Sequence, residues 1–177
     1  MTVGAIASFA ALQLGWFACV LGAARGHASV GPLVVVAALA AHVRLRPSGA
    51  RAREVAVLIS AALLGFLVDT AFLRSGVIAF GEALASPAWL VVLWPNTAAA
   101  TASGGSLVAL VRRPLLAALV GAVAAPIAYD AGARFGALAL GEGRLRALAI
   151  IGIVWAGVLP AFFMIRERLG GAREASA

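Results

Sequence analysis

Six stretches of apolar residues run through this chain, separated by short segments that carry arginine. A helix that crosses a lipid bilayer needs about 20 residues, and most of these stretches reach that length. Hydrophobic residues make up 63% of the sequence and charged residues only 12%, which excludes an ordinary water-soluble domain. The chain is therefore predicted to be an all-α membrane protein, a single transmembrane domain over residues 1–177. Its six spanning helices are expected at about 3–24, 31–43, 55–73, 88–111, 115–140 and 147–165.

Helices four and five of this six-helix transmembrane bundle are expected to be kinked, because each contains a proline, Pro95 or Pro126. Proline removes one helical hydrogen bond and its ring clashes with the preceding turn. After Pro95 the fourth stretch becomes small and polar, and the hydroxyls of Thr97 and Thr101 can bond the freed carbonyls. This helix is expected to face protein or a cavity rather than lipid.

The arginines predict the orientation of the chain. All 14 Lys and Arg positions are arginine, and nine of them lie in the segments 44–54 and 112–113 and in the tail after 165. Four lie in the other connections, and Arg134 is expected within the membrane. Because cytoplasmic loops carry the excess of basic residues, both termini are predicted to be cytoplasmic. The same distribution explains the net charge of +7 without nucleic-acid binding.

Several polar side chains fall inside the apolar stretches. Asp130 and Arg134 are four residues apart on the expected fifth helix, so they share a face and can pair. At 1.5 Å per residue, Asp69 and Asp130 lie about 22 Å from the cytoplasmic start of their helices, and Asn96 lies about 12 Å from the opposite surface. Asp69, Asn96, Tyr129, Asp130 and Arg134 are therefore expected to form one polar layer within the membrane.

This polar layer has three interpretations. It is a structural network, or a pocket for the polar end of a lipophilic molecule or a small solute, or an enzyme site that uses two carboxylates. The sequence contains neither HExxH nor GxSxG, and it has two histidines and one cysteine, so no metal and no cofactor is expected. Gln13, near the middle of the first stretch, is expected either to bond another helix or to contact a ligand.

Four motifs carry a resemblance to a known family. They are QLGWFACVLGAA at 13–24, Gly65-x-x-x-Asp69 followed by Gly76-Val77 and Phe80, Pro87-x-Trp89 with Leu93-Trp94, and Pro126-x-x-Tyr129-x-x-Gly132 with Gly136-Ala137. The chain resembles an uncharacterised bacterial integral inner-membrane family, domain of unknown function 2878. Where that family suggests Trp-x-x-Phe, this chain has Trp94-Pro95-Asn96-Thr97. The resemblance implies a bacterial inner-membrane location and genes near cyclopropane-fatty-acid-synthase-like methyltransferases, and it assigns no catalytic residue.

Three functions are compatible with these observations. The first is an accessory or lipophile-binding protein linked to membrane lipid modification or envelope stress. The second is a small-solute carrier or the substrate-binding subunit of a transporter, and the third is a membrane-embedded lipid-modifying enzyme. The expected partners are membrane lipids, a lipophilic ligand or small solute, and a partner membrane protein or a second copy of the chain.

Overall fold

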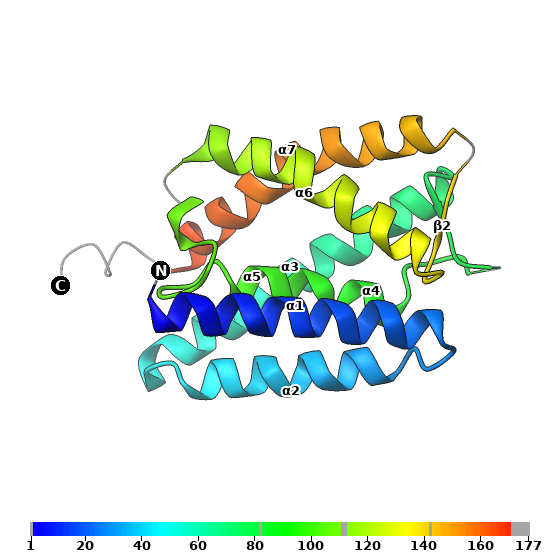
Figure 1. Cartoon of the computed structure of the whole chain (residues 1–177). Coiled ribbons are helices and arrows are strands. Elements are labelled where there is room, and N and C mark those ends of the chain that lie inside the picture. Colours follow the sequence, from blue (N-terminus) through cyan, green and yellow to red (C-terminus); the bar gives the residue numbers. More distant parts are fainter. Residues whose placement is uncertain (1, 82, 111–112, 142, 171–177) are drawn as a thin grey trace.

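The computed structural model describes residues 2–81, 83–110, 113–141 and 143–170, and it is helical over most of that length (Figure 1). This confirms the all-α prediction. The chain runs back and forth between the two ends of the bundle, and the N-terminus and the end of the last helix lie at the same end (Figure 1). The main helices are α1 (Val3–Ala24), α2 (Val30–Arg44), α3 (Ser48–Arg74), α4 (Ala88–Val91), α5 (Leu93–Ala99), α6 (Pro114–Arg134) and α7 (Arg144–Gly170).

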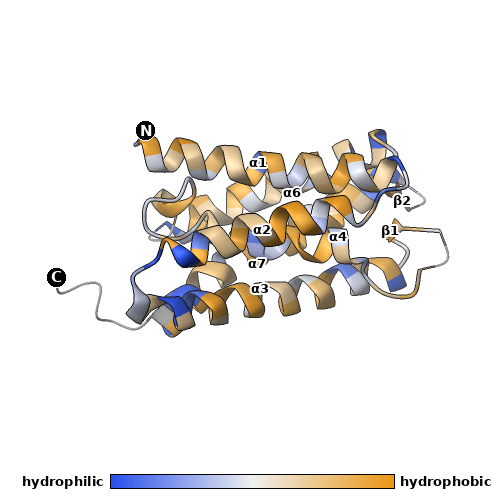
Figure 2. Ribbon diagram, turned by 90° about the horizontal axis from the view of Figure 1, so that it is seen from below, coloured by the Kyte–Doolittle hydropathy of each residue, from blue (hydrophilic) through white to orange (hydrophobic). Residues whose placement is uncertain are grey.

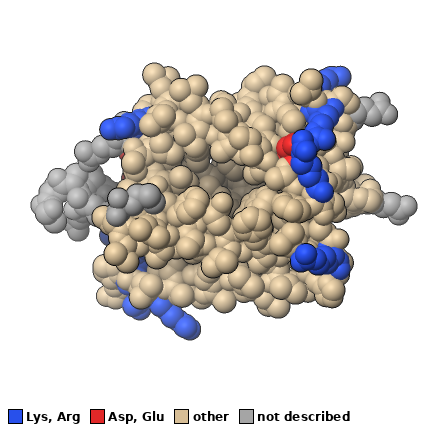
Figure 3. Space-filling model, viewed as in Figure 1, with Lys and Arg blue, Asp and Glu red and all other residues tan. Residues whose placement is uncertain are grey.

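Four of the described helices, α1, α3, α6 and α7, are long and apolar enough to cross a membrane. Helix α2 is apolar but shorter, with 15 residues. Hydrophilic residues gather at the two ends of the bundle (Figure 2), and the arginines on the face shown in Figure 3 also lie at its two ends. The middle of the helices exposes large apolar side chains, such as Leu33, Leu63 and Ile153. This distribution is typical of a helical membrane protein.

The fourth expected span is not one helix. The segment 88–99 forms the two short helices α4 and α5, and it is followed by turns and a single 3₁₀ turn, η1 (Val108–Leu110). The break falls at Val92 because the ring of Pro95 clashes with the carbonyl four residues earlier, at Val91. The hydroxyl of Thr97 donates to the Leu93 carbonyl, at 2.9 Å, and not to the Val91 carbonyl that Pro95 leaves free. The expectation of one helix over 88–111 was therefore wrong.

The fifth expected span, at 115–140, is also shorter in the structure, since α6 ends at Arg134. Gly136 has a φ of 85°, the left-handed conformation that terminates helices and that glycine adopts without strain. Beyond it, strand β2 (Ala139–Leu140) pairs antiparallel with β1 (Ile78–Ala79). Pro126 lies inside α6, which continues through it as one helix. The early end of α6 changes the depth of the polar residues in its last turns.

Glycines let several helices approach closely. A Cβ atom on Gly121 of α6 would lie 2.2 Å from the Trp155 carbonyl oxygen of α7, and one on Gly31 of α2 would lie 2.3 Å from the Cys19 Cα of α1. Neither position tolerates a side chain without moving a backbone. Close backbone approach at small residues is the usual way in which membrane helices pack. Close contacts of this kind hold α1 against α2 and α6 against α7. Between the two pairs, α1 and α6 border a space.

Candidate functional site

A cavity of about 500 Å³ lies between α1, the segment α4–α5 and α6. In Figure 3 the surface is hollowed near the middle of the face shown, in the region that α1 and α6 border in Figure 1. The centre of the hollow is at the level of the apolar middle of the helices (Figure 2 and Figure 3). Its lining is mainly aliphatic and aromatic, with α1 contributing Phe9, Leu12, Gln13, Trp16 and Val20 and α6 contributing residues that include Val120, Ala124, Ile127, Ala128 and Gly132.

Aromatic rings form much of the wall of this cavity. All four tryptophans of the sequence, Trp16, Trp89, Trp94 and Trp155, line it. The rings of Trp94 and Trp155 lie 4.6 Å apart between centroids, with an interplanar angle of 35°. Such large rigid side chains give a cavity apolar surface at low cost in conformational entropy, and apolar lining with a few polar groups is typical of small-molecule sites.

Asp69 lies behind two of these rings rather than in the cavity itself. Its side chain is on α3 and is fully buried. One carboxyl oxygen accepts the Trp94 indole N–H at 2.7 Å, and the other accepts the Tyr129 hydroxyl. Because Trp94 and Tyr129 both line the cavity, Asp69 fixes the orientation of two of its wall residues. Asp69 and Tyr129, two members of the expected polar layer, are therefore in direct contact.

The Gly65-x-x-x-Asp69 motif has a direct structural explanation. Gly65 lies one helical turn before Asp69 on the same face of α3. A Cβ atom at Gly65 would lie only 2.1 Å from Cγ of Trp94, so the absence of a side chain makes room for the indole. Gly65 and Asp69 therefore form the binding position of the Trp94 side chain, called here the seat of Trp94: Gly65 leaves room for the ring, and Asp69 accepts its N–H.

Asn96 and Gln13 lie at a different part of the cavity wall. The Asn96 amide nitrogen donates to the Leu12 carbonyl at 3.1 Å, which attaches α5 to α1. A Cβ atom at Gly15 would lie 2.6 Å from the same nitrogen, so this contact also depends on glycine. Gln13 is exposed toward the cavity that it lines. Asn96 is therefore held by α1, and the structure gives it no hydrogen bond with Asp69.

Asp130 and Arg134 pair as their spacing predicts, with Arg134 Nε donating to Asp130 Oδ2 at 2.8 Å. Their depth differs from the expectation. They occupy the last turns of α6, where the Arg134 side chain is 70% exposed, and Arg144 at the start of α7 forms a second ion pair with Asp130. Because α6 ends at Arg134, this pair lies at the end of the bundle. The single polar layer expected from the sequence was therefore wrong: Asp69 and Tyr129 lie inside the bundle, and Asp130 and Arg134 lie at its end.

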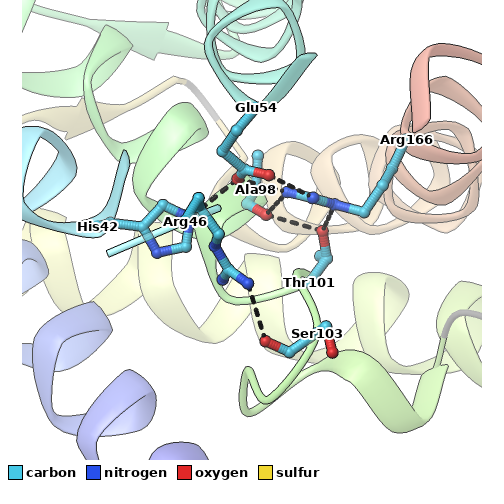
Figure 4. Close-up of polar contacts among 7 residues, drawn as sticks. All are labelled: His42, Arg46, Glu54, Ala98, Thr101, Ser103 and Arg166. Carbon is cyan, nitrogen blue, oxygen red and sulfur yellow. Dashed lines mark hydrogen bonds and ion pairs between the residues drawn. The ribbon is translucent and has the colours of Figure 1, made fainter. Parts of the chain in front are cut away.

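A second ion-pair cluster, which was not predicted from the sequence, lies near the start of α3 and the end of α7, and Figure 4 shows its contacts. Arg166 of α7 binds Glu54 of α3 through two hydrogen bonds, at 2.7 and 2.9 Å. His42 of α2 contacts the same carboxylate at 2.8 Å, and Arg166 also bonds the Thr101 hydroxyl. The Glu54 side chain is only 7% exposed. The sequence does contain a signal for this cluster. Glu54 directly precedes the third apolar stretch and Arg166 directly follows the sixth, and in a six-span topology these two positions lie at the same end of the bundle.

Within the described ranges, no three His, Cys, Asp or Glu side chains come together in a way that could hold a metal ion.

The bundle and its lateral apolar cavity define the class as a helical membrane protein. The sequence matches the family described as Protein of unknown function (DUF2878) over residues 5–161, and the chain belongs to that family. No curated protein and no solved structure matches the chain.

Proposed function

We propose that this protein crosses a bacterial inner membrane six times and holds a lipophilic molecule in the cavity between α1 and α6. The observation that carries the proposal is the cavity itself. Its volume of about 500 Å³ lies within the range of roughly 300 to 1,000 Å³ usual for small-molecule sites, and its lining is mainly apolar. A molecule that reaches the cavity from the hydrocarbon layer has no need to pass through water.

The chain direction supports six crossings. Helices α1, α3, α6 and α7 are long enough to span, and α2 and α4–α5 run between their two ends (Figure 1). The broken backbone at α4–α5 suits a position inside the protein, because Trp94, Asn96 and Ala98 are buried there. With Arg134 moved to the end of the bundle, the arginines of the sequence divide nine to five, which favours cytoplasmic termini.

The alternatives of a solute carrier and an enzyme receive less support from the geometry. A carrier needs access from water, and at one end of the bundle the polar side chains Glu54 and Arg166 are paired with each other and buried. An enzyme that uses Asp69 needs that carboxylate in contact with its substrate, and both oxygens instead accept hydrogen bonds behind the rings of Trp94 and Tyr129. We therefore favour binding over transport or catalysis, in an accessory role in membrane lipid metabolism with the surrounding lipids as partners.

Native mass spectrometry of the protein purified in a mild detergent tests this function. Ala128 lines the cavity, so Ala128→Phe places a ring in that space. The matched control is Ala37→Phe, at an exposed alanine of α2 that does not line the cavity. We expect a lipophilic molecule to remain on the wild type and on Ala37→Phe and to be lost from Ala128→Phe. Equal retention by all three proteins would contradict binding in the cavity.

A further inference from the structure

The cavity is elongated along the helices. Its lining residues on α1 extend from Phe9 to Val20 and those on α6 from Val120 to Gly132, which at 1.5 Å per residue is about 17 Å. The volume of about 500 Å³ is distributed along this length, so the space is long rather than round. The space therefore suits one extended chain that lies parallel to the helices. A compact solute would fit this shape less well.

The two ends of the elongated space differ in charge. On α6, Arg134 is only two residues beyond Gly132, the last lining residue of that helix, or about 3 Å along the axis. At the other end, Arg113 precedes Val120 by seven residues, or about 10 Å. Arg134 and Ala131 are three residues apart, so Arg134 lies above the face of α6 that borders the cavity. Of these two described arginines, Arg134 is therefore the one close to an end of the space.

The charge at that end is not fully neutralised within the cluster. Asp130 lies between Arg134 and Arg144, so these three side chains carry a net charge of +1. Among the described residues, Arg134 uses only its Nε in this pairing, and its side chain is 70% exposed. Its terminal nitrogens are therefore available to bond an anionic oxygen, which guanidinium groups bind in a planar, two-point geometry.

From this shape and this charge we infer that the ligand is a single-chain amphiphile with an anionic head group of the fatty-acid type. Its hydrocarbon chain occupies the space between α1 and α6, and its carboxylate binds Arg134 at the end of α6. The inference rests on the proposed function and makes it more specific, since it names the ligand class and the residue that selects it. Trp16 and Phe135, whose rings lie 6.2 Å apart between centroids, join α1 to the end of α6 beside the head group.

Tryptophan fluorescence provides the test, because all four tryptophans line the cavity and bromine atoms quench nearby indoles. The probes are 9,10-dibromostearate and the matching uncharged alcohol, titrated separately into the full-length protein in a non-ionic detergent. We expect half-maximal quenching by dibromostearate at a concentration at least about threefold lower than by the alcohol. A charge-assisted hydrogen bond to Arg134 increases the binding affinity by at least about that factor. High salt should reduce this preference.

Variants distinguish the head-group inference from the proposed function. Arg134→Gln should remove the preference for the acid and leave quenching by the alcohol unchanged, whereas Arg168→Gln, at the far end of α7, should leave both unchanged. Equal affinity for acid and alcohol in the wild type would overturn the inference and leave the cavity as a lipophile site. Stronger quenching by a brominated two-chain phosphatidylglycerol would overturn the single-chain assignment. Absence of quenching by every probe would contradict the proposed function itself.

Discussion

In the described part of the chain, two carboxylates each lie between two basic side chains, one at each end of the bundle, and their clusters differ in burial. Glu54 is 7% exposed, and its partners His42 and Arg166 are 20% and 16% exposed. Asp130 is 19% exposed, and its partners Arg134 and Arg144 are 70% and 49% exposed, so the two clusters differ mainly in the exposure of their basic side chains. The Glu54 cluster joins α2, α3 and α7, while the Asp130 cluster joins the end of α6 to the nearby start of α7. The contribution of an ion pair to the fold therefore depends on its burial and on which helices it joins, rather than on the charges themselves.

The largest effect is expected at the buried cluster. Arg166→Met leaves the Glu54 carboxylate without its main partner in a desolvated position, and breaking a buried pair in this way costs about 3 to 5 kcal/mol. We expect a loss of that size in the free energy of unfolding, measured by titration with sodium dodecyl sulfate. The control for a changed charge is Arg168→Met, two residues further along the same helix, which should have little effect.

A double variant makes this expectation sharper. Removing both charges with Glu54→Gln and Arg166→Met should cost less than the sum of the two single changes, because neither charge is then left without a partner. Additive losses would show that the two side chains do not interact, and would remove the contrast between the two ends of the bundle.

A smaller effect is expected at the seat of Trp94, between the two charged ends. Gly65→Ala adds a Cβ atom that would lie 2.1 Å from Cγ of the indole, so the ring must move and its hydrogen bond with Asp69 must weaken. Overpacking of this kind costs about 1 to 3 kcal/mol. The change in unfolding free energy and the shift of the tryptophan emission spectrum measure it.

Gly49→Ala is the matched control, because a Cβ atom at Gly49 meets nothing within 4 Å. It lies in the same helix and should be neutral or slightly stabilising, since alanine favours helix more than glycine does. If the two alanine variants have the same stability, the close contact of Gly65 with Trp94 is incorrect.

The smallest effect is expected at the exposed cluster. Asp130→Asn removes a carboxylate that is 19% exposed and whose arginine partners are 70% and 49% exposed, and ion pairs that water reaches in this way contribute little to stability. We expect no measurable change in melting temperature or in the yield of folded protein. A loss as large as that of Arg166→Met would place the pair inside the membrane, as the sequence alone suggested, and would contradict the exposed position.

The sequence predicts local features of this protein well and distant contacts poorly. Apolar length predicts the long helices α1, α3, α6 and α7, and a spacing of four residues predicts the Asp130–Arg134 pair. The depth of that pair depends on where Gly136 ends α6, which hydropathy does not reveal because the chain remains apolar beyond it. Glu54 and Arg166 are 112 residues apart, so their contact follows only from the packing of α3 against α7.

The Asp69 site shows the same division. The sequence indicates that Asp69 is a buried acid, and Gly65 one turn earlier signals a close neighbour on that face. Neither residue identifies Trp94 as that neighbour, because the seat forms only when Pro95 breaks the helix and the short α5 packs against α3. The position of the cavity wall therefore depends on the helix break at Pro95, and the effect of that break on the packing of α5 against α3 cannot be deduced from the local sequence.

The proposed function requires that the space between α1 and α6 opens to the hydrocarbon layer. A nitroxide spin label at Ala128, introduced as Ala128→Cys in a Cys19→Ala background and reconstituted in lipid, measures this opening directly. We predict that oxygen, which dissolves in the hydrocarbon layer, relaxes the label strongly, and that a water-soluble nickel chelate does not. Stronger relaxation by the nickel chelate would reveal a water-filled path and contradict the account, and protection from both reagents would contradict an open cavity.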